Sequence, residues 1–175
     1  MGVATAVPAT ATTASGEYCH AGCQARGGDG VRGGDGVRGD NVITTHHLTE
    51  AAAVRAAQAA LDAAEADGQR VSVAVVDRNG NAIVQLRGDG AGPHTYESAR
   101  LKAYTAASFN APTSVLVGRL EQNPTLADIP GTLFLAGGVP VQFQGAPIAG
   151  IGVAGAPSGL SDEQYAQAGL AAISH

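Results

Sequence analysis

The sequence predicts an α/β fold in which helices flank a mainly antiparallel, five-stranded sheet, preceded by an N-terminal tail. Three observations carry this prediction. Runs of β-branched residues alternate with alanine-rich stretches of helical length between residues 49 and 173. Two of these runs are joined by Asn79-Gly80, a pair typical of tight hairpins. Of the 175 residues, 35 are alanine and 25 are glycine, which favours helices packed closely on a sheet.

Residues 1–41 are expected to be a disordered tail, and residues 42–175 a single domain. The tail holds ten of the 25 glycines and two identical copies of a Gly-Gly-Asp-Gly-Val-Arg hexapeptide, over 27–38. Such a segment buries too little apolar surface to offset the entropy of ordering it. Its cysteines, Cys19 and Cys23, supply neither a disulfide framework nor the four ligands of a zinc site.

The domain is expected to begin with a helix over residues 50–66. Thr49 is a suitable N-cap, the stretch has high helix propensity, and Gly68 is a natural stop. The β-branched run 71–77 is then predicted to be a strand, with 82–87 returning as its hairpin partner.

The second half of the domain is predicted to add three helices and three strands. A helix over about 95–109 follows a glycine-rich loop, and a shorter one over about 112–120 follows it. Ser161 and Gln164 have the spacing of a capping box, which predicts a final helix ending near residue 173. The strands are expected over 132–135, 139–143 and 148–154.

Charge and motif content exclude several classes of protein. Ten Lys and Arg against fifteen Asp and Glu give a net charge of −5, which argues against nucleic-acid binding and against a basic membrane-surface protein. No apolar run approaches the roughly 20 residues that membrane insertion requires. The nucleophile motif Gly-x-Ser-x-Gly and the phosphate-binding motif Gly-x-x-x-x-Gly-Lys are both absent.

The side chains best suited to binding chemistry gather around the second predicted helix. His94 lies just before it and could ligate haem iron or another metal. Arg100 and Lys102 could neutralise the carboxylates of a ligand, and Tyr104 could stack on a flat one. Thr113 adds a hydroxyl directly after the helix. The alternative for His94 is an ordinary loop residue, and for the others simple helix packing.

Asp62 and Glu65 form a second candidate site, on the first predicted helix. They are three residues apart and therefore share a face, where two carboxylates could take up iron through oxygen. The alternative is an ordinary solvated helix face.

Three blocks of residues carry a resemblance to a known family. They read VSVAVVD over 71–77 with Asn79-Gly80, then AxxKAYTA over 99–106, and then GGVPV over 137–141 followed by Gly145, Ile148, Gly150, Gly152, Val153, Gly155, Asp162 and Glu163. From Leu48 onward, over about 125 of the 175 residues, the sequence resembles the GlcG/HbpS family of haem-binding and haem-degrading proteins. The same domain is found at the C-terminus of PduO-type proteins.

The resemblance implies a homo-oligomer, commonly an octamer, that binds haem and degrades it with O₂ or peroxide. HbpS-like members also bind iron and signal redox state to a membrane sensor histidine kinase. Lys102 matches the family's Lys-Ala-x-Thr-Ala motif and is expected to face the ligand. His94 and Thr113 are the candidates near the iron, and Asp62 and Glu65 match the acidic pairs associated with iron uptake.

Three questions remain open at this stage. The resemblance implies an extracellular protein, yet residues 1–16 lack the charged start and continuous apolar stretch of a secretory signal, so a cytoplasmic location is the alternative. A corrinoid such as cobalamin could replace haem as the tetrapyrrole. A non-catalytic regulatory or scaffold subunit would use the helix faces for docking alone.

Overall fold

The computed structural model describes residues 36–174. They belong to two units, which meet in the sequence between Val42 and Ile43. The described part of the first unit, residues 36–42, contains one short 3-10 helix, η1 (Gly39–Asn41), which has no buried residue. The cysteine pair and the expected disorder of residues 1–35 lie outside the described residues. The second unit contains, in order, α1 (Glu50–Ala66), β1 (Ser72–Asp77), β2 (Ala82–Arg87), α2 (Pro93–Phe109), α3 (Thr113–Arg119), the 3-10 helix η2 (Pro124–Asp128), β3 (Gly138–Phe143), β4 (Ala146–Ala154) and α4 (Gly159–Ala171).

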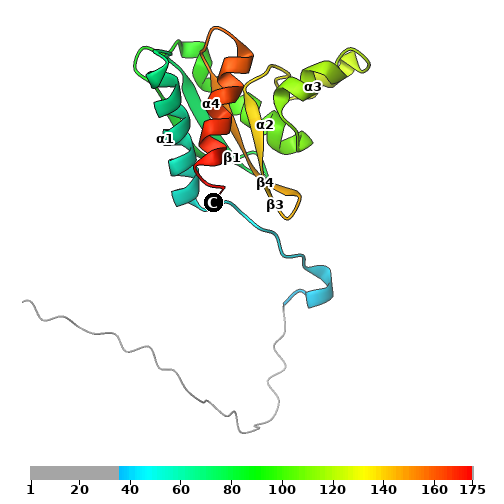
Figure 1. The fold of residues 1–175 in the computed structure, drawn as a ribbon. Coiled ribbons are helices and arrows are strands. Elements are labelled where there is room, and N and C mark those ends of the chain that lie inside the picture. Colours follow the sequence, from blue (N-terminus) through cyan, green and yellow to red (C-terminus); the bar gives the residue numbers. More distant parts are fainter. Residues whose placement is uncertain (1–35, 175) are drawn as a thin grey trace, which may run out of the picture. The chain divides into compact units, whose positions relative to one another are not determined.

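The described residues form one antiparallel sheet of four strands in the order β2-β1-β4-β3 (Figure 1). The prediction of an α/β fold with an antiparallel sheet is confirmed, but that of a fifth strand over 132–135 is wrong. There the backbone N–H of Leu133 donates to the Thr105 hydroxyl of α2 (2.8 Å) rather than to a strand. The ring of Phe134 packs edge-on against Phe109, with centroids 5.3 Å apart. Side chains of α2 therefore hold this segment as a loop.

The helices cover the two faces of the sheet unequally. α1 and α4 lie side by side on one face, and α2 packs against the other (Figure 1). Because side chains alternate along a strand, β1 contributes residues to the hydrophobic cores on both faces of the sheet. Val73 and Val75 point into the core beneath α1 and α4, whereas Ala74 and Val76 meet the alanines of α2. The α1 side of that core is made of Ala53, Ala56, Ala57, Ala60 and Ala64.

Glycines in β4 bring α2 close to the sheet. A Cβ built on Gly152 would lie 2.5 Å from the backbone nitrogen of Ala103 and 3.0 Å from its Cβ. One built on Gly150 would lie 3.1 Å from the Cβ of Ala107. The closest packing therefore requires hydrogen in place of a side chain on this face of β4, as the glycine content predicts.

The predicted N-cap of α1 is confirmed, whereas the start of α2 and the N-cap of α4 differ from the prediction. α1 has the expected bounds, and the Thr49 hydroxyl accepts a hydrogen bond from the N–H of Ala52 (3.3 Å). α2 begins at Pro93, two residues earlier than predicted. The cap of α4 is Ser158 and not Ser161, because Ser158 has extended backbone angles and its hydroxyl accepts from the N–H of Ser161 (3.1 Å).

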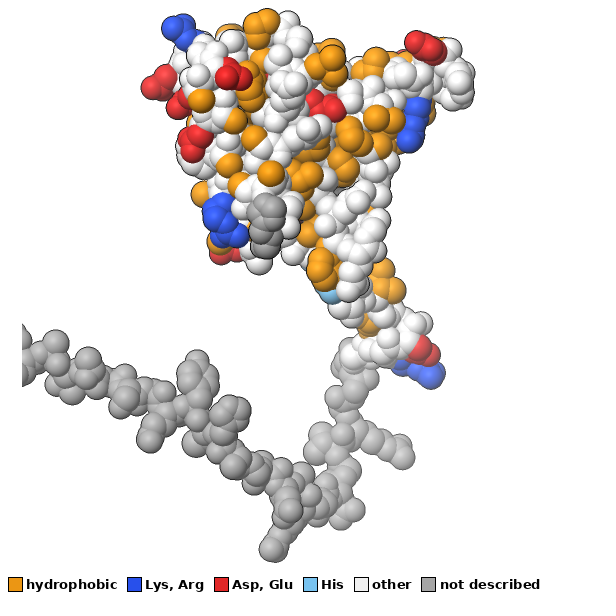
Figure 2. Space-filling view, in the orientation of Figure 1, with side chains coloured by type: hydrophobic (Ala, Val, Ile, Leu, Met, Phe, Trp, Pro, Cys, Tyr) orange, Lys and Arg blue, Asp and Glu red, His pale blue; other side chains and the backbone are white. Residues whose placement is uncertain are grey.

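Residues 113–131, here called the arm, contain α3 and η2. α3 extends away from the sheet (Figure 1), and Val115, Val117 and Ile129 are exposed on the arm. Figure 2 shows hydrophobic side chains on this part of the surface. The arm is therefore held mainly at its base.

Candidate functional site

A cavity of about 300 Å³ opens beside the N-terminal half of α2, where the β4–α4 loop and the first turn of α4 approach the helix. Three of its lining residues, His94, Ser98 and Lys102, come from α2. They are spaced four residues apart, so one face of the helix presents all three. The remaining lining residues are Leu135, Ala154, Gly155, Ala156, Pro157, Gly159 and Asp162.

Lys102 is almost completely buried, with 1% of its surface exposed. Its ammonium group donates to the carboxylate of Asp162 (2.7 Å) and to the carbonyl oxygen of Val153 (3.0 Å). A buried cation needs such compensation, because removing it from water is costly unless it is paired and hydrogen-bonded. The ion pair therefore ties α2 to β4 and α4 at the wall of the cavity.

Asp162 is held from the other side by the backbone N–H of Ala156, which donates to its second carboxylate oxygen (2.9 Å). Burial raises the pKa of the Asp162 carboxyl above its ordinary value, and the hydrogen bonds from Lys102 and Ala156 oppose that rise. Both carboxylate oxygens thus have fixed donors, and the carboxylate fixes the position of the ammonium group.

The absence of a side chain at Gly137 makes room for the ion pair of Lys102 and Asp162. The φ of this glycine, +130°, lies in the region that favours glycine. A Cβ at this position would lie 2.7 Å from the Lys102 Nζ and 2.9 Å from the Asp162 Cβ. Any larger residue would displace the ion pair.

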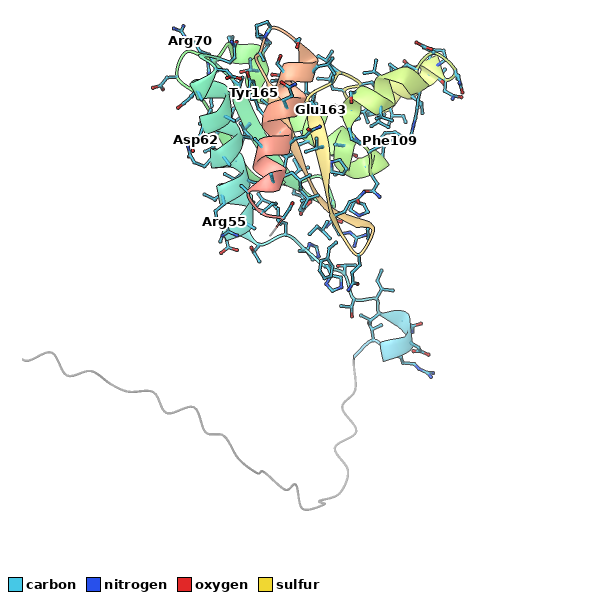
Figure 3. The ribbon with its side chains drawn as sticks, viewed as in Figure 1. Arg55, Asp62, Arg70, Phe109, Glu163 and Tyr165 are labelled. Carbon is cyan, nitrogen blue, oxygen red and sulfur yellow. The ribbon has the colours of Figure 1, made fainter. Side chains whose placement is uncertain are left out.

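Thr113 lies in a second buried cluster, at the base of the arm. Its hydroxyl accepts from the N–H of Gly138 (2.8 Å) and lies 3.5 Å from the Glu163 carboxylate. Glu163 also accepts from the N–H (2.9 Å) and hydroxyl (2.5 Å) of Ser114. Figure 3 shows Glu163 on the side of α4 that faces α3. The carboxylate therefore anchors the beginning of the arm.

The other two α2 candidates lie on the face of the helix opposite the cavity residues, since a two-residue offset from that stripe corresponds to about 200°. Arg100 forms a bidentate ion pair with Glu97 (2.6 and 3.0 Å). This hydrogen-bonded contact lowers the pKa of Glu97 and raises that of Arg100. The Tyr104 ring packs beneath Gly80, at the turn between β1 and β2, where a Cβ would overlap it. Neither side chain lines the cavity.

The acidic candidates, Asp62 and Glu65, are exposed on α1 (Figure 3 labels Asp62). Asp62 accepts a hydrogen bond from the amide of Gln58 (2.7 Å), and Glu65 lines a separate, polar hollow of about 440 Å³ with Arg70 and Asp89. Within residues 36–174, no three His, Cys, Asp or Glu side chains are grouped so as to hold a metal ion. The structure thus brings together His94 and Lys102, and leaves the other candidates at separate places.

Sequence reasoning missed the roles of Asp162, Glu163 and Gly137. Acidic residues near the N-terminal end of a helix are normally exposed, where they complement the helix dipole. Here both carboxylates are buried. The available signal was the pairing of a motif lysine with acidic residues about 60 positions later, but spacing alone does not say which carboxylate meets which donor.

Comparison with known proteins supplies the family. The family model described as haem degrading protein HbpS-like matches residues 48–171, most of the chain. The chain belongs to the HbpS-like family. No curated protein was found to match the sequence.

Solved structures agree with membership of the HbpS-like family. A crystal structure of HbpS is 66% identical, covers 80% of this chain and 99% of its own, and has a TM-score of 0.79. A structure of Streptomyces reticuli HbpS, with two glutamates three residues apart changed to aspartate, is 63% identical and has a TM-score of 0.79. The match covers 83% of this chain and 99% of that one. A structure described as a PduOC:heme complex is 25% identical and has a TM-score of 0.68. The match covers 74% of this chain and 96% of that one. Among the described residues, no helix of this HbpS-like chain is long and apolar enough to cross a membrane.

Proposed function

We propose that this chain binds haem at the α2 cavity, with His94 as the contact to iron. The observation that carries the proposal is that one cavity brings together an accessible imidazole, His94, and a buried ammonium group, Lys102. Membership of the HbpS-like family supports haem as the ligand, and so does the structural neighbour described as a complex with heme.

The side chains at the cavity fit this ligand. Imidazole is a common protein ligand of haem iron. His94 is exposed, and its ring lies against the backbone of Gly92, where a Cβ would be 2.8 Å from the ring Cε1. The alternative contact, the Thr113 hydroxyl, is fully buried and already has protein partners. Access therefore favours His94 over Thr113.

Haem degradation forms the second part of the proposal. Bound haem would supply an iron that activates O₂ or peroxide. The contribution of the chain is placement and access. A cavity of about 300 Å³ holds only part of a macrocycle, so much of the ring remains open to small molecules. Bilin formation in the presence of ascorbate or peroxide tests this activity, and intact haem after prolonged incubation contradicts it.

Titration of the full chain with hemin tests the binding. A Soret shift that saturates at a fixed stoichiometry is expected for the native chain, and His94→Ala is expected to weaken it about tenfold or more. Gly92→Ala should weaken it less, because the new Cβ displaces the ring without removing it. Thr113→Ala distinguishes the two iron contacts.

Each of the other possible titration results contradicts a different part of the proposal. If Thr113→Ala weakens the shift and His94→Ala does not, the assignment of the iron contact is wrong. A spectral change with cobalamin alone indicates the corrinoid function. No change with either tetrapyrrole leaves a regulatory or scaffold role.

The proposal extends to assembly, iron and signalling. We expect an extracellular homo-oligomer of eight chains that binds iron at Asp62 and Glu65 and reports redox state to a sensor histidine kinase. The spacing of this acidic pair equals that of the two glutamates changed in the Streptomyces reticuli variant. Native mass measurement tests the oligomer, and iron titration of Asp62→Asn with Glu65→Gln tests the acidic pair. Unchanged iron uptake in that variant would contradict it.

A further inference from the structure

We infer that the cavity holds a carboxylate arm of the ligand, and that Lys102 is the group that binds it. This inference rests on the proposed haem function and specifies which part of the molecule enters the cavity. Protoporphyrin carries two carboxyethyl arms, each of which is small enough for a space of about 300 Å³ that cannot enclose the whole ring.

Lys102 has one donor left for such a ligand. An ammonium group has three N–H donors. Two are used by Val153 and Asp162, and the hydrogen bonds among the described residues supply no third acceptor. Because Lys102 also lines the cavity, a ligand oxygen that enters can accept from it. Hydrogen bonds from a cation to a carboxylate are about twice as strong as neutral ones.

Three features of the lining suit an anionic oxygen, although most of its other residues are apolar or glycine. Asp162 is the only carboxylate in the lining, and Lys102 and the backbone N–H of Ala156 already engage it. Ser98 adds a hydroxyl. Gly159, the first residue of α4, places the positive end of a 13-residue helix at the same wall.

The distance along α2 allows iron and carboxylate to be bound together. His94 and Lys102 are eight residues apart, which corresponds to about 12 Å of helix. Helical side chains generally point toward the N-terminus of their helix, and this tendency shortens the span between His94 and the ammonium group of Lys102. A macrocycle over His94 can therefore extend one arm inward to Lys102.

Comparing hemin with its dimethyl ester, in which both carboxylates are blocked, tests the inference. The native chain should bind hemin about tenfold more tightly than the ester. His94→Ala should weaken both ligands by a similar factor and so preserve their ratio. Lys102→Met combined with Asp162→Leu removes the ion pair without leaving a buried unpaired charge, and should reduce the ratio to about one.

Two more variants keep the test decisive if the double variant does not fold. Ser98→Leu narrows the cavity and should also lower the ratio. Arg100→Gln is the matched control, since it removes a cation from the opposite face of α2 and should leave the ratio unchanged. The inference is overturned if the native chain binds hemin and its dimethyl ester equally well. It is also overturned if Arg100→Gln is the only variant that lowers the ratio of the two affinities. Failure of the native chain to bind either compound overturns the proposed haem function itself.

Discussion

Replacing Gly152 by alanine tests whether the close packing of α2 on the sheet sets the geometry of the cavity. The new Cβ would lie 2.5 Å from the backbone nitrogen of Ala103, whereas ordinary contacts of a Cβ begin near 3.4 Å. The opposing atoms belong to the backbone of a helix, so no side chain can rotate away. α2 must move outward by about 1 Å, and Lys102 moves with it.

The expected loss of stability follows from overpacking. Inserting a methyl group into a filled core costs about 1–3 kcal/mol, and rigid backbone on the opposite side places Gly152→Ala near 3 kcal/mol. For a domain of this size, we expect the melting temperature to fall by about 10 °C. Hemin affinity should fall as well, since the cavity residues of α2 are displaced.

Thermal unfolding followed by circular dichroism is the assay, with Gly118→Ala as the control. Gly118 lies in α3 with nothing within 4 Å of an added Cβ, so this variant should gain about 0.5–1 kcal/mol from helix propensity. If Gly152→Ala melts within 2 °C of the native chain, the close contact between α2 and β4 does not limit the stability of the domain.

Two further predictions concern buried or hydrogen-bonded carboxylates. Burial raises the pKa of Asp77, but hydrogen bonds from Asn81 and from the N–H of Asn79 outweigh it and hold the pKa below the ordinary 3.8. The stability that these hydrogen bonds contribute is therefore present above pH 3.8 and is lost as the pH falls through the lowered pKa. Asp77→Asn should therefore cost about 1 kcal/mol in urea unfolding at pH 7 and progressively less below pH 3.8, and a pH-independent difference would contradict this. Glu163→Gln leaves a donor of Ser114 without its carboxylate partner, which should cost about 1–3 kcal/mol and accelerate proteolysis within the arm; cleavage at the native rate would show that Glu163 does not anchor it.

Local sequence signals predicted most of the fold. Thr49 and the alanines after it were sufficient for α1, and Asn79-Gly80 for the hairpin of β1 and β2. The error at 132–135 arose because an apolar run has the same pattern in a strand and in a loop fixed by side chains. Only the distant Thr105 and Phe109 decide between them.

The site was less accessible to sequence reasoning. Helical spacing allows His94 and Lys102 to share a face, and the same spacing places Arg100 and Tyr104 on the opposite one, but grouping by proximity in sequence overlooked that division. The burial of Lys102 depends on Asp162, 60 residues later. No local pattern specifies a contact of that range, because it exists only once the sheet has brought α2 and α4 together.

Asp162 and Glu163 are neighbours in α4 but contact different parts of the molecule. Consecutive side chains on a helix diverge by about 100°, so Asp162 reaches Lys102 while Glu163 reaches Ser114. Turning α4 about its axis would improve one of these contacts only at the expense of the other. The beginning of α4 is therefore held from two sides, at the cavity through Asp162 and at the base of the arm through Glu163.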